Sequence, residues 1–83
     1  VSGRLLLEAK GPGYAKFVRN GEFQRFFRGQ DALVEQAKRQ LGAANGAPIV
    51  WHVAEEEAAT AIRNLLKNNE IIEITVVHTP VVP

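Results

Sequence analysis

An acid and an amine stand close together near the start of the chain, at Glu8 and Lys10, immediately before Gly11-Pro12-Gly13. The aliphatic run that leads into them predicts a β-strand over residues 4–10, and side chains alternate along a strand, so Glu8 and Lys10 share a face. A carboxylate can hold a divalent cation, and a neighbouring lysine can polarise water or neutralise a phosphate. The pair is therefore half of a metal-dependent site for phosphodiester cleavage. The competing interpretation is a solvated cross-strand ion pair.

Length and composition allow one small folded domain. The 83 residues are 46% hydrophobic and 23% charged, a balance that excludes a wholly disordered chain. Cysteine is absent, which excludes disulfides and thiolate metal sites. No run approaches the roughly 18 apolar residues of a membrane span, and no signal peptide is visible, so no membrane partner is expected.

The charge is unevenly distributed along the chain. Residues 1–40 carry a net charge of +4, whereas residues 41–83 carry −3. The positive half contains Glu8 and Lys10, which suits a polyanion lying across the site. The stretch from Tyr14 to Arg28 also interleaves basic and aromatic residues, which can hold phosphates and stack on bases. For most of its phenylalanines we prefer a simpler interpretation, in which they close the edge of a small core: Phe17, Phe23, Phe26 and Phe27.

Hydrophobic patterns predict the order strand, helix, strand, helix, strand. The predicted strands cover residues 4–10, 48–53 and 71–77, and the predicted helices start at Asp31 and Ala54. The first helix is expected to end at Gly42 or at Asn45-Gly46, and the second at Asn68-Asn69. Short helical turns are expected over residues 14–19 and 22–28. Helical crossovers require parallel neighbouring strands, so the sequence predicts an α/β fold.

This topology places Glu8 and Lys10 where ligands collect in open α/β sheets, at the carboxyl end of a strand. The next helix would bring Gln36, Arg39 and Gln40 to them. Their amides and guanidinium could hold a scissile phosphate or position water, although the two glutamines could also be solvated edge residues. Two histidines on the later strands are expected to have structural roles: His52 and His78.

Several blocks of the sequence resemble one known family. They are Glu8-Ala9-Lys10-Gly11-Pro12-Gly13-Tyr14, Gln36-Ala37-Lys38-Arg39-Gln40, Val50-Trp51-His52 and Val77-His78-Thr79-Pro80. Together they are similar to the restriction-endonuclease-fold toxin domain, class five, of bacterial polymorphic toxins, within the PD-(D/E)xK nuclease superfamily. The similarity covers nearly the whole chain, and the first block is its most specific part. It implies a partial restriction-endonuclease-like core of strand-helix-strand-helix-strand with parallel crossovers.

The resemblance also implies a function and a set of site residues. The family consists of antibacterial DNases at the ends of secreted effectors, often type VI secretion effectors, which act in the cytoplasm of a target bacterium and are paired with an immunity protein. By this resemblance Glu8 would bind Mg²⁺ together with the carbonyl of Ala9, and Lys10 would orient or activate the attacking water. Gln36 would support the site. Contacts with DNA are expected from Lys16, Arg39 and Gln40.

One feature of the superfamily is missing from the sequence. The superfamily carries a metal-binding Asp on the strand before Glu-x-Lys, but the single Asp of this chain is Asp31. A lone carboxylate holds Mg²⁺ poorly. We therefore expect residues 1–83 to form a single domain, the C-terminal part of a nuclease domain whose upstream helix and strands were cleaved off or lie on another chain, leaving a raw sheet edge. The alternatives are a non-catalytic module that binds nucleic acid or an immunity protein, and a ribonuclease on the same scaffold.

Overall fold

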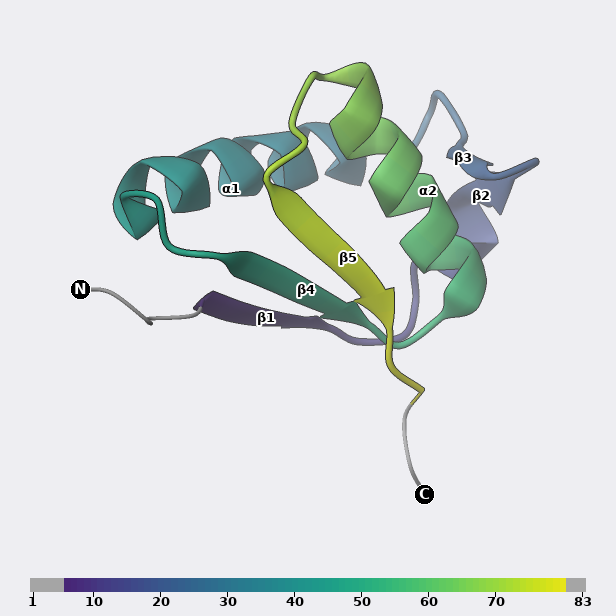
Figure 1. The fold of residues 1–83 in the computed structure, drawn as a ribbon. Helices are drawn as coiled ribbons and strands as arrows, with labels where there is room; N and C mark the ends of the chain where they lie inside the picture. The colour runs from purple at the N-terminus through teal and green to yellow at the C-terminus, as the bar shows by residue number, and fades with distance from the viewer. Residues whose placement is uncertain (1–5, 81–83) are drawn as a thin grey trace.

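A parallel sheet carries two helices on one of its faces in the computed structural model, which describes residues 6–80 (Figure 1). The three strands are β1 (Leu6–Lys10), β4 (Ile49–Val53) and β5 (Ile74–His78), and β4 lies in the centre. Helices α1 (Gly29–Ala44) and α2 (Glu56–Asn68) form the two crossovers. The predicted α/β class and the parallel order of strands and helices are confirmed. The first residues of the predicted strand, 4 and 5, lie outside the described residues.

The segment between β1 and α1 differs from the prediction of two helical turns. A short 3₁₀ helix, η1 (Ala15–Phe17), is followed by a hairpin of β2 (Val18–Arg19) and β3 (Glu22–Phe23). Asn20 and Gly21 have φ values of 55° and 81°. Positive φ at both central residues is the geometry of a two-residue hairpin turn, and Asn-Gly is its strongest sequence signal. The prediction of a helical turn over residues 14–19 is confirmed in part by η1, but the turn predicted over 22–28 begins as strand β3 because this pair joins two strands instead of separating two helices.

Helix α1 begins earlier than the predicted start and ends at one of the two predicted positions. It starts at Gly29, so Asp31 lies in its first turn, and it ends where Asn45 adopts a left-handed conformation with a φ of 51°. Of the two predicted ends, the one at Asn45-Gly46 is therefore confirmed. Helix α2 starts at Glu56, after the predicted Ala54, and β5 starts at Ile74, after the predicted Ile71. No helix of the described residues is long and apolar enough to cross a bilayer.

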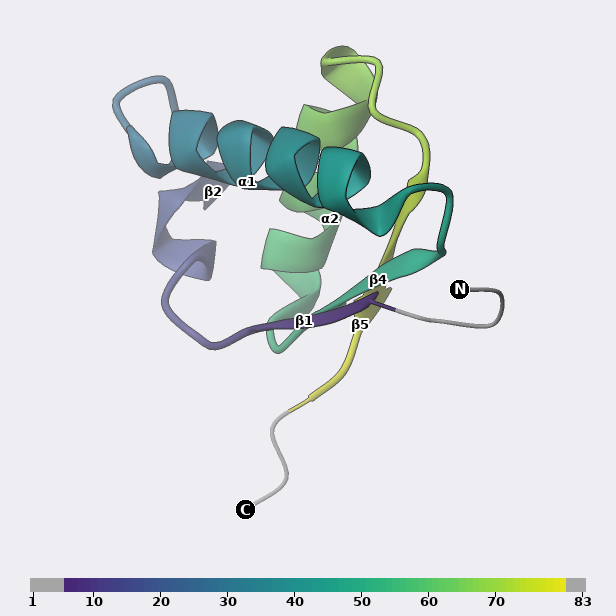
Figure 2. The ribbon, with the colours of Figure 1, turned by 90° about the vertical axis from the view of Figure 1, so that its left-hand side faces the viewer.

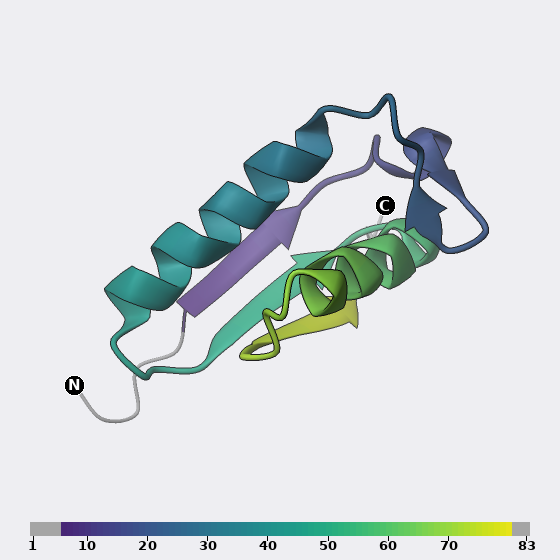
Figure 3. The same cartoon turned by 90° about the horizontal axis from the view of Figure 1, so that it is seen from above.

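The core fills the space between the sheet and the two helices, which Figure 2 shows from the side. Strand β4 sends Ile49, Trp51 and Val53 into it, all with 2% or less of their surface exposed. Small residues on α2, among them Ala58 and Ala61, let that helix approach the sheet closely. Figure 3 shows α1 alongside β1 and α2 above the β5 side of the sheet.

The phenylalanines between β1 and α1 divide into two groups. Phe23 is buried, and Phe27 stacks on Phe17 with their ring centroids 4.3 Å apart. For these three the prediction of a core plug is confirmed. Phe26 is 68% exposed and is the exception, which agrees with a prediction made for most of the four rings.

The sheet has one face without a helix among the described residues. Val50 and His52 are only half-buried there, and Leu7 is 63% exposed. Strand β4 is therefore fully buried on one face only, although parallel sheets are usually covered on both sides.

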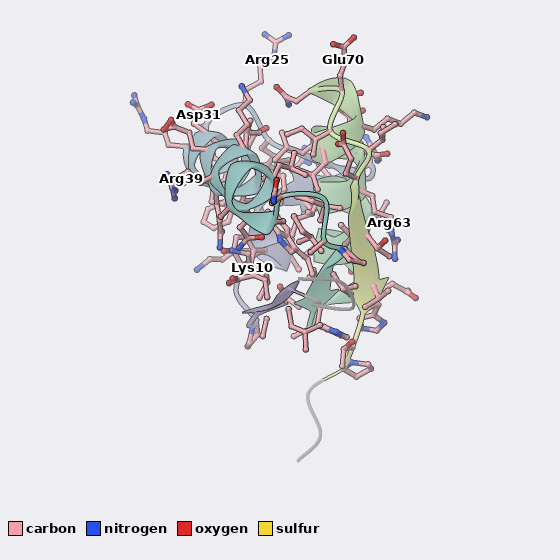
Figure 4. The ribbon with its side chains drawn as sticks, turned by 60° about the vertical axis from the view of Figure 1, so that its left-hand side comes forward. Lys10, Arg25, Asp31, Arg39, Arg63 and Glu70 are labelled. Carbon is pink, nitrogen blue, oxygen red and sulfur yellow. The ribbon has the colours of Figure 1, made fainter. Side chains whose placement is uncertain are left out.

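The two outer edges of the sheet differ. On β5 the guanidinium of Arg63 donates from Nε to the carbonyl of Val76 at 3.0 Å, and Figure 4 shows Arg63 beside this strand. Strand β1 is paired only with β4 among the described residues. The β1 edge thus has the unpaired backbone groups that the sequence led us to expect at a raw edge.

Candidate functional site

Glu8 and Lys10 lie on the helix-facing side of β1. Their strand neighbours on β4 are Trp51 and Val53, both of which point into the core, so the register fixes the direction of the pair. The Nζ of Lys10 is 3.6 Å from Oε2 of Glu8, and the two side chains are 10% and 29% exposed. Figure 4 shows Lys10 between β1 and α1. The pair is therefore partly enclosed by the helix above it and is not a solvated surface ion pair.

Two glutamines on α1 hold this pair from above. Gln36 and Gln40 are one helical turn apart and face the same side of α1. The Nζ of Lys10 donates a hydrogen bond to Oε1 of Gln36, and Nε2 of Gln40 donates to Oε1 of Glu8 at 3.2 Å. Each member of the acid-amine pair thus has its own partner on the helix. The alternative that both glutamines are solvated edge residues is wrong, because both are engaged with β1.

Trp51 completes the cluster from the centre of the sheet. Its indole Nε1 donates to Oε1 of Gln40 at 2.8 Å, and Nζ of Lys10 lies 4.9 Å from the centroid of its ring. The residue is fully buried. Sequence reasoning missed it, although a buried tryptophan on a strand next to β1 needs a partner for its N–H. We call Glu8, Lys10, Gln36, Gln40 and Trp51 the β1–α1 cluster.

The cluster is held in one arrangement by its own contacts. No side-chain nitrogen or oxygen that is buried in the described part of the chain lacks a hydrogen-bond partner. Because a carboxylate has about four lone-pair sites, Glu8 can still accept further partners after its contacts with Gln40 and Lys10. The arrangement can present an acid and an ammonium group to a ligand without first reorganising.

The carbonyl of Ala9 lies on the outer side of β1. The carbonyl of Lys10 accepts a hydrogen bond from the N–H of Ala54 at 3.0 Å, so it points toward β4. Backbone groups alternate in direction along a strand, and the carbonyl of Ala9 therefore points toward the open edge. Residues 6–80 contain no group of three or more side chains that could hold a metal ion. Glu8 and the carbonyl of Ala9 fit part of the oxygen shell of Mg²⁺, which also takes water and substrate phosphate.

Glu55 anchors the loop that follows β1. Its Oε1 accepts three backbone N–H groups, from Gly13 at 3.1 Å and from Tyr14 and Ala15 at 2.9 Å each. Sequence reasoning missed this role, because the partners are about forty positions apart in the chain and no local pattern links them. The sequence feature that could have indicated this role is the position of Glu55 just beyond the end of β4, the strand that pairs with β1.

The remaining predicted residues lie outside these contacts. Lys16 is exposed, with its Nζ 5.3 Å from the centroid of the Phe17 ring. Arg39 is exposed on the outer side of α1 (Figure 4). His52 Nδ1 is 2.9 Å from the hydroxyl of Thr79, and His78 Nε2 is 3.2 Å from a backbone carbonyl, which agrees with structural roles for both.

Comparison with protein families identifies the chain. The family described as restriction endonuclease fold toxin 5 matches residues 2–56. This span contains the β1–α1 cluster and Glu55. Comparisons with curated proteins and with solved structures gave no match. Because the matched span covers more than half of the chain, the protein belongs to the restriction endonuclease fold toxin 5 family.

Proposed function

We propose that this chain is the motif-bearing part of a metal-dependent DNase, the toxin domain of a secreted antibacterial effector. The observation that carries the proposal is the β1–α1 cluster, in which Glu8 and Lys10 are each held by a glutamine at the carboxyl end of an edge strand. Membership of a toxin family with a restriction endonuclease fold supports it. The proposed site of action is the cytoplasm of a target bacterium.

The proposed roles follow from the contacts of each residue. Lys10, positioned by Glu8 and Gln36, would orient the attacking water and offset charge on the phosphate oxygens. Mg²⁺, held by Glu8 and the carbonyl of Ala9, would supply Lewis-acid chemistry when bound. Gln40 would hold the carboxylate of Glu8 in place. Lys16 and Arg39, both exposed cations, are proposed to contact the DNA backbone.

We further propose that a second chain completes the metal site. The backbone of Leu7 and Ala9 faces the open edge of β1, where an added strand could pair by main-chain hydrogen bonds. A carboxylate on that strand within about 5 Å of Glu8 could share one cation with it. The upstream part of the toxin domain is the proposed donor. The cognate immunity protein is a proposed partner of the assembled toxin.

Nicking of supercoiled plasmid by the full-length toxin tests the proposal. With Mg²⁺ present, Glu8→Gln and Lys10→Ala are each expected to lower the rate by about 10²-fold or more. The matched controls are Glu57→Gln and Lys67→Ala, an exposed acid and an exposed amine on α2, which should keep the wild-type rate. Full activity of both Glu8→Gln and Lys10→Ala would show that the assigned roles are wrong.

Two further arms separate the competing functions. An RNA substrate of the same sequence tests for ribonuclease activity, and cleavage of RNA but not DNA would contradict the proposed substrate. Binding of plasmid without cleavage, in Mg²⁺ and with the full-length toxin, would point to the non-catalytic binding module. Expression inside a bacterial host without its immunity protein should be toxic, and Lys10→Ala should abolish that toxicity.

A further inference from the structure

Phe26 is an exposed aromatic ring that is nevertheless held in place. It is 68% exposed, whereas Phe23 of the same segment is buried. One side of it contacts Phe17, with ring centroids 6.2 Å apart and an angle of 69° between the planes. An edge-to-face contact of this kind fixes the orientation of a ring without covering its other surface. Phe26 therefore presents an aromatic surface to solvent at a defined position.

Beside Phe26 lies a pocket of about 790 Å³, formed where the segment before α1 meets α1 and the end of α2. Its volume is in the range of small-molecule sites. Arg25, Arg28 and Lys38 contribute cationic side chains to its wall. Arg25 and Phe26 also line a neighbouring depression of about 560 Å³, to which Arg19 contributes. Phe26 and Arg25 thus line both hollows.

The cations of the pocket are available to a ligand. Asp31 and Glu35 also line the pocket, but the single salt bridge within residues 6–80 joins Lys10 and Glu8. Arg25, Arg28 and Lys38 therefore have no carboxylate oxygen within 4.0 Å among the described residues. Figure 4 shows Arg25 extending away from the body of the molecule. These three cationic side chains are therefore not engaged in salt bridges with described residues and can bind phosphates.

We propose that Phe26 and this pocket bind single-stranded nucleic acid, with a base stacked on the ring and phosphates held by Arg25, Arg28 and Lys38. Stacking on an aromatic side chain requires an unpaired base, which a duplex does not offer. Because Arg25, Arg28 and Lys38 outnumber Asp31 and Glu35 in the pocket lining, the lining has a net positive charge that attracts a polyanion. The inference rests on the proposed function for one point only, which is that the polymer is the DNA substrate.

The pocket would bind a flank of the substrate and not the bond that is cut. Lys38 follows Gln36 by two positions on α1, so the two side chains point to nearly opposite sides of the helix. Gln36 contacts Lys10 in the β1–α1 cluster, and Lys38 lines the pocket. A strand in the pocket would therefore be separated from the cluster by the width of α1.

Fluorescence anisotropy with a labelled oligothymidylate of about ten nucleotides tests the inference. The full chain is titrated into the labelled oligonucleotide in the presence of a metal chelator, so that binding is measured without cleavage. Phe26→Ala is expected to weaken binding by about five-fold or more, and Phe26→Trp to preserve it. Ile72→Ala is the matched control, because Ile72 is also an exposed apolar residue, at 81%, and lies outside the pocket. Thermal unfolding checks that all three variants fold.

Salt dependence tests the cations separately. The double variant Arg28→Ala, Lys38→Ala should reduce the slope of log affinity against log salt by about 1.4, since each phosphate contact on a single strand contributes about 0.7. Lys67→Ala, outside the pocket, should leave the slope unchanged. Absence of oligothymidylate binding, or equal affinity of Phe26→Ala and the wild type, would overturn the inference and leave the pocket to a protein partner. Failure of plasmid nicking would defeat the nuclease proposal but leave this result standing.

Discussion

Trp51 determines the orientation of Gln40. The buried indole Nε1 donates to Oε1 of Gln40 at 2.8 Å, which leaves Nε2 of the same amide facing Glu8 at 3.2 Å. Because an amide has one acceptor end and one donor end, the tryptophan selects the end that the carboxylate meets. The position of Glu8 at the edge of the sheet is thus linked to a residue of the central strand.

Replacement of Gln40 by alanine should destabilise the protein. The variant leaves the buried N–H of Trp51 without a partner, and an unsatisfied buried donor costs about 1–3 kcal/mol. Urea unfolding measures the change. In the double variant Gln40→Ala, Trp51→Phe no donor is left unsatisfied, so the two effects should not add. Strictly additive changes would show that the hydrogen bond does not couple the two residues.

Loss of the Glu55 carboxylate should release the loop after β1. Glu55→Ala removes the acceptor of three backbone N–H groups, and we expect a loss of about 1–3 kcal/mol in the free energy of unfolding. Hydrogen exchange of the Gly13, Tyr14 and Ala15 amides should become faster. Glu57→Ala serves as the control, because this exposed acid contributes only about 0.3–1 kcal/mol through the dipole of α2. Unchanged exchange at Gly13–Ala15 would contradict the anchoring role.

Two glycine substitutions should have opposite effects on stability. Gly21→Ala forces a side chain into the positive-φ turn of the hairpin, at 81°, and should cost about 1–2 kcal/mol although its Cβ would make only ordinary contacts. Gly42→Ala lies in the α1 helix with no atom within 4 Å of the added Cβ. It should stabilise the protein by about 0.5–1 kcal/mol. Thermal unfolding of the two variants gives the signs directly.

Magnesium should bind the isolated chain weakly. Glu8 is the only carboxylate of the β1–α1 cluster, and the carbonyl of Ala9 is the other ligand that we propose. At a Mg²⁺ concentration equal to its Kd, the stabilisation is about 0.4 kcal/mol, which appears as a small rise in Tm. Glu8→Gln should abolish that rise and Glu57→Gln should not. A larger rise that persists in Glu8→Gln would place the cation elsewhere.

The parts of the fold that follow local patterns were predictable from the sequence. The apolar stripe of α1, the run of β4 and the acids that start α2 each determine an element by themselves. The hairpin was missed because its strands are two residues long, too short for any alternation to be visible. Only the Asn20-Gly21 pair identifies it, and the same pair is also compatible with a break between helices.

The candidate site was predictable to the extent that it depends on strand and helix periodicity. Alternation along β1 places Glu8 beside Lys10, and the helical repeat places Gln36 and Gln40 on one side of α1. The contributions of Trp51 and Glu55 depend on the register of β1 with β4, which no local pattern contains. Their chemical roles, and those of the predicted DNA and metal ligands, stay predictions.

The difference between the two borders of the sheet limits how copies of this chain can associate. A strand added at β5 would have to displace the Arg63 side chain from the Val76 carbonyl, whereas no side chain of the described residues is hydrogen-bonded to the outer backbone of β1. Endless fibrils of stacked sheets require two accepting borders per molecule. Pairing through β1 is therefore expected to be preferred, and two copies that pair through β1 form a closed dimer in which neither β1 edge can take a further strand.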